Sequence, residues 1–203
     1  SHFQLGEVEF DEVKQSAFTN YSRTLDLATA THTATFEFGG TTYTRRAIAS
    51  HPDNIVAWEI TADAPGEISG NLNLIGAHTA LEKITTRNRT LTLEGTLPNN
   101  LNYAAQAVMI PKGGRVTEAD GTLRVDKADS VLVVLAADTN YVMNLAANWR
   151  QGQSLDRVKP RLKLAAAKSF EAMRRDHVRD YRSLFDRVSL DLGKTDETLA
   201  GRP

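Results

Sequence analysis

Histidine and carboxylate side chains are the candidates for catalysis or metal binding in this sequence, which contains no cysteine. The absence excludes thiolate catalysis, disulfides and cysteine-based metal sites. The histidines show neither the i,i+4 spacing of a helical zinc site nor a His-Glu-x-x-His pattern, so surface or core roles are favoured. They are His2, His32, His51, His78 and His177. The sequence therefore predicts no metal ligand and no cofactor-binding residue.

The carboxylates give no clear catalytic pair. Hydrolysis of a glycosidic bond uses two carboxyl groups about 5–10 Å apart, and none of the 25 acidic residues forms an obvious pair. Asp138 is the best positioned, since it follows an apolar run and precedes Thr139, but polar groups there commonly satisfy the backbone at a strand end. Gly193-Lys194-Thr195 resembles the end of a phosphate-binding loop, yet Val188 occupies the position of the required glycine. We predict no catalytic residue in this chain.

Most of the sequence up to residue 138 has the composition of short antiparallel strands. Thr, Val, Ile and Leu occur in runs separated by turn residues such as Gly39-Gly40 and Asp120-Gly121, which suit tight hairpins. About ten strands without intervening helices favour a sandwich or barrel over a βαβ fold. The expected strands are 3–10, 33–38, 41–48, 54–61, 68–74, 84–86, 90–93, 103–110, 115–117, 122–125 and 131–137. The nearly continuous apolar run 131–137 predicts a central strand buried on both faces.

A helical segment follows. Pro160 suits the first turn of a helix, and an apolar stripe then recurs at helical spacing as far as residue 185. We expect a break at Arg174-Arg175-Asp176, a short strand at 189–192, and a loose tail at 194–203. The domain division is thus a β-sandwich at 1–150, a helical linker ending in a short strand at 151–193, and the tail.

Charge marks the same boundary. Residues 1–156 contain 12 basic and 18 acidic side chains, whereas 157–187 contain 10 and 4, so net charges of −6 and +6 lie side by side. Acidic residues interrupt the basic segment and its apolar stripe is continuous. This favours packing of the helix on the acidic sandwich or a neighbouring domain over nucleic-acid binding.

Composition excludes other classes. The chain is 41% hydrophobic and 24% charged, as in ordinary globular proteins. No apolar run approaches the roughly 20 residues of a membrane span, so no membrane partner is expected. The first residues lack the pattern of a signal peptide.

Several stretches in order resemble the N-terminal domain of glycoside hydrolase family 95, the inverting α-L-fucosidases and their relatives. They are residues 3–8 (Phe3-Gln4-Leu5-Gly6-Glu7-Val8), 21–30, 40–46, the corner Ala49-Ser50-His51-Pro52-Asp53, and 137–141. The most specific is 177–193, from His177 through Tyr181 and Phe185 to Gly193, which is similar to that family's linker into the catalytic domain. Residues 76–130 depart most from the family pattern.

The resemblance implies a β-supersandwich, a helical linker and then an (α/α)₆ catalytic barrel that holds the catalytic residues. The barrel is expected to follow this chain in the same polypeptide, and the fragment alone is expected to be inactive. The resemblance also implies a bacterial, secreted or cell-surface glycoside hydrolase that cleaves α-L-fucosyl bonds with inversion. The alternative from the residues is an autonomous carbohydrate-binding module, which requires exposed aromatic rings on one sandwich face; only 7% of residues are aromatic.

Overall fold

The computed structural model describes residues 6–12, 18–190 and 193. Within them lie ten strands, two α-helices and one 3₁₀ turn. The strands are β1 (Gly6–Glu12), β2 (Thr19–Asp26), β3 (Thr31–Phe38), β4 (Thr41–Ser50), β5 (Ile55–Ala62), β6 (Ile68–Gly76), β7 (Glu82–Arg87), β8 (Thr90–Thr96), β9 (Asn102–Ala119) and β10 (Thr122–Thr139). The 3₁₀ turn is Thr79–Leu81, and the helices are α1 (Ser154–Ala166) and α2 (Phe170–Phe185).

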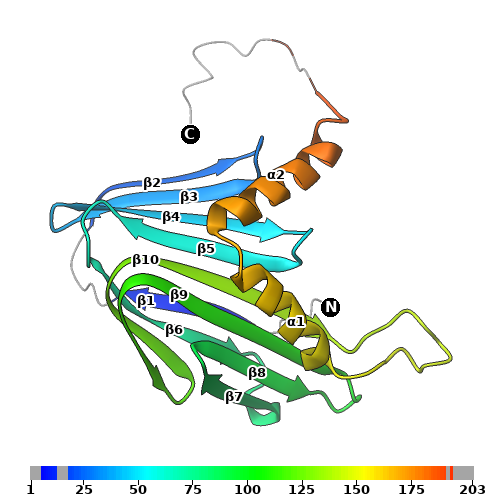
Figure 1. Ribbon diagram of the computed structural model, residues 1–203. Coiled ribbons are helices and arrows are strands. Elements are labelled where there is room, and N and C mark those ends of the chain that lie inside the picture. Colours follow the sequence, from blue (N-terminus) through cyan, green and yellow to red (C-terminus); the bar gives the residue numbers. More distant parts are fainter. Residues whose placement is uncertain (1–5, 13–17, 191–192, 194–203) are drawn as a thin grey trace.

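The strands form two layers. The large layer has the order β2-β3-β4-β5-β10-β9-β8-β7, and every pairing is antiparallel. β6 branches from the first part of β10 and carries β1 at its outer side, which gives the smaller layer behind the sheet in Figure 1. The prediction of a mainly β, antiparallel sandwich followed by a helical segment is confirmed.

Two apolar cores lie on opposite faces of the large sheet. Between the layers, Ile68 and Leu72 of β6 pack with Leu93 of β8 and with β9 and β10. The two helices cover the outer face of the sheet (Figure 1). Their apolar side chains pack there with residues of β4, β5, β9 and β10. Neighbouring residues of a strand point to opposite faces, so Val133 enters the first core and Val134 the second. The expected double burial of strand 131–137 is therefore confirmed.

Three strand predictions need correction. β2 was not expected as a strand, and the structure shows that all eight of its residues are exposed. The strands expected at 103–110 and 115–117 form the single strand β9, and those at 122–125 and 131–137 form β10. The hairpin continues past Pro111 and Gly113-Gly114, with a register shift between Ala128 and Ser130.

The helix boundaries also differ from the expectation. α1 begins at Ser154, so Pro160 lies inside the helix and not in its first turn. The expected break at Arg174-Arg175-Asp176 is wrong, because α2 continues through it and the chain breaks at 167–169. There Ser169 caps α2 by accepting a hydrogen bond from the Ala172 amide. Of the strand expected at 189–192, the first two residues are not in a strand and the others lie outside the described residues.

Neither α1 nor α2 is long and apolar enough to cross a membrane, and no other helix of the described residues is.

Candidate functional surfaces

Asp138, the carboxylate singled out in the sequence, joins the sheet to α1. Its Oδ2 lies 3.0 Å from the Nη2 of Arg161 and 3.8 Å from the Nε of Arg157. The two arginines also donate to backbone carbonyls at the end of β10, at Ala137 and Thr139. Its Oδ1 accepts a hydrogen bond from the Thr139 amide at 2.7 Å, as expected for a polar group at a strand end. Its Oδ2 holds α1 at the end of β10.

A second charged cluster holds the start of α2. Lys168, in the break between the helices, lies 2.6 Å from the carboxylate of Asp53 and 3.1 Å from that of Asp176. Hydrogen bonds to the two carboxylates, first to Asp53 and then to Asp176, raise the pKa of Lys168. The hydrogen bond from Lys168 lowers the pKa of Asp176. Lys168 and Asp176 thus each favour the charged form of the other.

Arg46 of β4 is a third link between sheet and helix. Its guanidinium lies 2.5 Å from Glu59 on β5 and 2.5 Å from Glu171 on α2, and it stands over the ring of Phe170 with 4.8 Å to the centroid. Burial opposes the charge, but the hydrogen bonds to the two glutamates outweigh it and raise the pKa of Arg46. The cation bonds two glutamates on separate elements, so its role here is positional.

The last turns of α2 hold the turn between β2 and β3. His177 is buried, and its Nε2 donates to the carbonyl of Ala30 at 3.2 Å. Tyr181 donates to the Leu27 carbonyl at 2.8 Å, and Arg182 donates to the next carbonyl along at 3.0 Å. Residues of the linker-like stretch 177–193 therefore dock the helix on backbone groups of the stretch 21–30.

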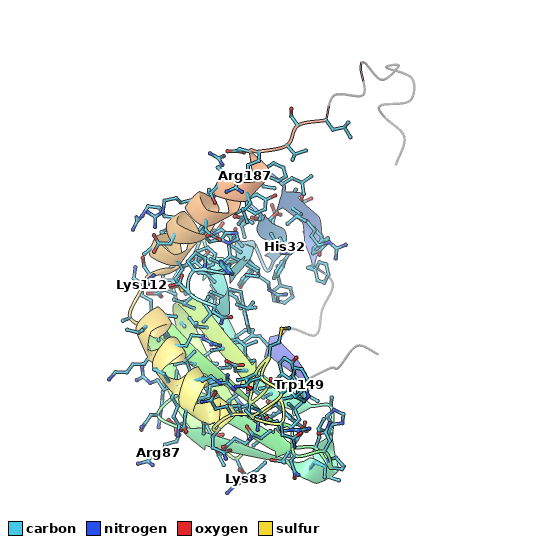
Figure 2. The ribbon with its side chains drawn as sticks, turned by 90° about the vertical axis from the view of Figure 1, so that its right-hand side faces the viewer. His32, Lys83, Arg87, Lys112, Trp149 and Arg187 are labelled. Atoms are coloured by element: carbon cyan, nitrogen blue, oxygen red, sulfur yellow. The ribbon has the colours of Figure 1, made fainter. Side chains whose placement is uncertain are left out.

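The opposite face of the sheet contains an open groove of about 560 Å³. Alternation along the strands separates this face from the helices: Arg45 and Trp58 point into the groove, whereas Ile48 and Ala57 point into the helix-side core. The other side chains that line it include Phe10, Tyr21, Arg23, His32, Ala34, Phe36, Ala47, Val56, Ile60 and Leu135. His32, labelled in Figure 2, lies on the side of the sheet away from the helices.

The groove joins an apolar floor to a basic rim. Phe36 is buried beneath the guanidinium of Arg45, whose carbon is 5.1 Å from the ring centroid. Tyr21 and Arg23 of the exposed strand β2 form one wall. Such a surface can stack rings and pair with anions, but it brings no two carboxylates together across the groove. Because β2 was missed in the sequence, so was this wall.

A smaller groove of about 450 Å³ lies beside α1, on the helix side of β7, β8 and β9. Its lining mixes polar and apolar side chains: Gln106 donates to the hydroxyl of Thr92 at 2.9 Å, and Lys159 and Lys163 of α1 also line it.

The histidines occupy separate places. His51 lies 3.3 Å from Asp180 of α2, and His78 lies edge-on to Tyr103 at 6.1 Å between ring centroids. His32 is in the groove, His177 is in the helix–sheet contact, and His2 lies outside the described residues. In the part of the chain that the structure describes, no three His, Asp or Glu side chains group so that they could hold a metal ion. The expected lack of catalytic and cofactor-binding residues stays a prediction.

Comparison with known proteins identifies the class of domain. Residues 1–144 match the family described as "Glycosyl hydrolase family 65, N-terminal domain", and the chain belongs to this family. It is 27% identical over 210 residues to a probable alpha-fucosidase A of Aspergillus niger, and 26% identical over 221 residues to alpha-L-fucosidase 2 of Arabidopsis thaliana. Each match covers 95% of this chain, which spans only 26% of either relative. The coarser part of the resemblance, a glycoside hydrolase N-terminal domain with fucosidase relatives, is confirmed.

Solved structures share the fold at low identity. A putative kojibiose phosphorylase from the human microbiome matches with a TM-score of 0.58 and 13% identity, over 88% of this chain and 27% of that one. A bacterial glucoamylase complexed with acarbose matches with a TM-score of 0.51 and 10% identity, over 88% and 31%. At these identities the likeness concerns the fold alone.

Proposed function

We propose that this chain is the non-catalytic N-terminal sandwich and linker of a family 95 α-L-fucosidase, and that it positions a catalytic (α/α)₆ barrel belonging to the same polypeptide. The parent reaction would be hydrolysis of α-L-fucosyl or related glycosidic bonds with inversion. The fucosidase relatives support the substrate class, and the share of their length that this chain spans supports a larger parent protein.

The observation that carries the proposal is the way the helices are held on the sandwich. Val158, Leu162, Phe170 and Met173 are buried against the sheet. Charged clusters around Asp138, Lys168 and Arg46 hold α1, the break and the first turn of α2, respectively. A linker held this way is not a flexible tether. It fixes the direction of α2 relative to the sandwich, as a support for a second domain requires.

The test compares two proteins: the complete gene product containing this chain, and the 203-residue chain alone. On an aryl α-L-fucoside, the complete product should turn over and release β-L-fucose first, seen by NMR, while the short chain should show no turnover. Enzyme-like turnover by the short chain would refute the non-catalytic role. A complete product that fails to hydrolyse fucosides would refute the assignment of the parent.

The groove on the other face supports a second candidate, an autonomous carbohydrate-binding module. Tyr21 is 53% exposed at its edge, and Trp58 and Arg23 also line it, so rings and hydrogen-bond donors for a sugar are present. Calorimetric titration of the 203-residue chain with fucosylated oligosaccharides separates the candidates. Saturable heat that is lost in Tyr21→Ala would favour the binding module, and a flat titration would favour the supporting role.

A further inference from the structure

The loop between β10 and α1 has features that neither the sandwich nor the linker requires. We name residues 140–153 the apical loop; it extends beyond the ends of the strands and of α1 in Figure 1, and Figure 2 labels its Trp149. Its backbone is closed on itself: Val142 donates to the Trp149 carbonyl at 3.0 Å, and the Trp149 amide donates to the Asn144 carbonyl at 2.9 Å. The loop therefore has a defined conformation.

The base of the apical loop is tied to both neighbours. The side chain of Asn140 is buried and accepts a hydrogen bond from the Asn102 amide at 3.0 Å. The side chain of Asn102 in turn accepts from the amide of Ser154, the first residue of α1, at 2.9 Å. One strand end, the loop base and the helix start thus form one hydrogen-bonded unit, so the direction of the loop is set by the sandwich.

The loop exposes large apolar side chains. Met143 is 86% exposed and Leu145 73%, while Tyr141 and Trp149 are 49% and 40% exposed with nearly parallel rings, 4° apart in plane and 6.4 Å between centroids. Between Asp138 and Asp156 the chain carries a single charged residue, Arg150. Protein interfaces are enriched in Tyr, Trp, Met and Arg and depleted in Lys, Asp and Glu.

The backbone at the end of the loop is strained. Asn148 has a φ of +50° and Trp149 a φ of +61°. Asparagine tolerates this region, but a bulky aromatic residue there is an outlier, and such strain concentrates at sites that serve a function. Here it sets the direction of the Trp149 ring.

We propose that the apical loop is a docking arm that inserts Met143 and Leu145 into an apolar recess of a further domain of the same polypeptide. The inference rests on the proposed function. A further domain is the expected partner of the loop because the chain spans only about a quarter of the relatives' length. A sugar could stack on Tyr141 or Trp149, but it would leave the two most exposed side chains, at the tip of the loop, without a role. A protein recess accounts for all four.

Photocrosslinking in the complete gene product tests the arm. p-Benzoylphenylalanine is placed at Met143, and in a control protein at Ile75, which is 44% exposed on β6 in the smaller layer. We expect crosslinks from position 143 to peptides outside residues 1–203 of the same molecule, in several-fold higher yield than from position 75. Crosslinks confined to residues 1–203, equal yields at both positions, or crosslinks to an isotopically labelled second copy would each overturn the inference.

A sugar titration covers the alternative ligand. The chain has two tryptophans, so a Trp58→Phe background isolates the fluorescence of Trp149. The Trp149 fluorescence is expected to stay unchanged when fucosylated oligosaccharides are added. A saturable change in this fluorescence would overturn the docking arm and show that the loop binds a sugar. The outcome is separate from that of the proposed function: crosslinks to a domain without fucosidase activity would support the arm and refute the fucosidase assignment.

Discussion

Replacing Phe170 with alanine should release α2 from the sheet. The ring is 1% exposed, belongs to the helix-side core with Met173, and lies under the guanidinium of Arg46. Truncation of a buried phenylalanine to alanine costs about 3–5 kcal/mol, and the lost cation–π contact accounts for roughly 0.5–1 kcal/mol of it. At about 1.4 kcal/mol per factor of ten, the opening equilibrium of α2 should shift by roughly a thousand-fold.

Hydrogen exchange of the α2 amides measures this shift directly, and urea unfolding of the chain reports whether the sandwich is affected as well. Leu164→Ala is the matched control, because Leu164 lies on α1 but is 72% exposed; a change within about 0.5 kcal/mol is expected there. If Phe170→Ala costs less than about 1 kcal/mol, or no more than the control, α2 is not held by its buried face and the reasoning fails.

Three further outcomes follow from single groups. Asp138→Asn should weaken the hold on α1 by about 0.2–1 kcal/mol, the usual value of a partly exposed ion pair, seen as modestly faster exchange of α1 amides. Unchanged exchange would contradict it. The pKa of Asp176 is lowered in the folded state, so its contribution to stability is present above its ordinary pKa of 3.8 and is lost as the pH falls through the lower folded pKa. The free energy of unfolding of Asp176→Asn, measured against pH, should lack this part of the stability loss in acid. A pH profile identical to that of the unchanged chain would refute the link to Lys168. Gly114→Ala should destabilise the β9–β10 hairpin more than Gly39→Ala in thermal unfolding: both have positive φ, but only at Gly114 would a Cβ lie 2.5 Å from a backbone oxygen, whereas nothing lies within 4 Å at Gly39. Equal losses of thermal stability in the two variants would show that the positive φ, and not the contact of the added Cβ, causes the destabilisation.

Much of the fold could be predicted from local patterns. Gly39-Gly40 joins two strands and Gly121 closes a hairpin, because positive φ at these positions is a local requirement that the sequence displays. The double burial of 131–137 was equally readable from its unbroken apolar run. β2 and the length of β9 were not readable, since an exposed strand and a strand crossing Pro111 depend on pairing with distant segments.

The helix boundaries show the same division. The start of α1 depends on Asn102, a residue more than fifty positions away whose side chain accepts from the first helical amide. No local pattern reveals such a cap. The break before Phe170 could have been predicted, because Ser169 is a favourable N-cap, but the break was expected at Arg174-Arg175-Asp176. The grooved face escaped prediction because its wall is β2.

Apolar burial and charge have different tasks where the helices meet the sandwich. Burying a Leu, Phe, Val or Met side chain contributes about 1.5–3 kcal/mol each, and four such side chains of α1 and α2 are buried in the helix-side core. The ion pairs are partly exposed; in the Arg161–Asp138 pair, for example, the side chains are 20% and 25% exposed, respectively. Pairs of this kind contribute about 0.2–1 kcal/mol to stability. The charges therefore select where the helices lie along the sheet, while the apolar stripe supplies most of the stabilisation.

Raising NaCl to about 1 M, where the screening length falls to about 3 Å, should accelerate exchange of the α2 amides far less than Phe170→Ala does. Release of α2 by salt to the same extent would mean that the opposite charges of linker and sandwich, and not the apolar stripe, hold the two together.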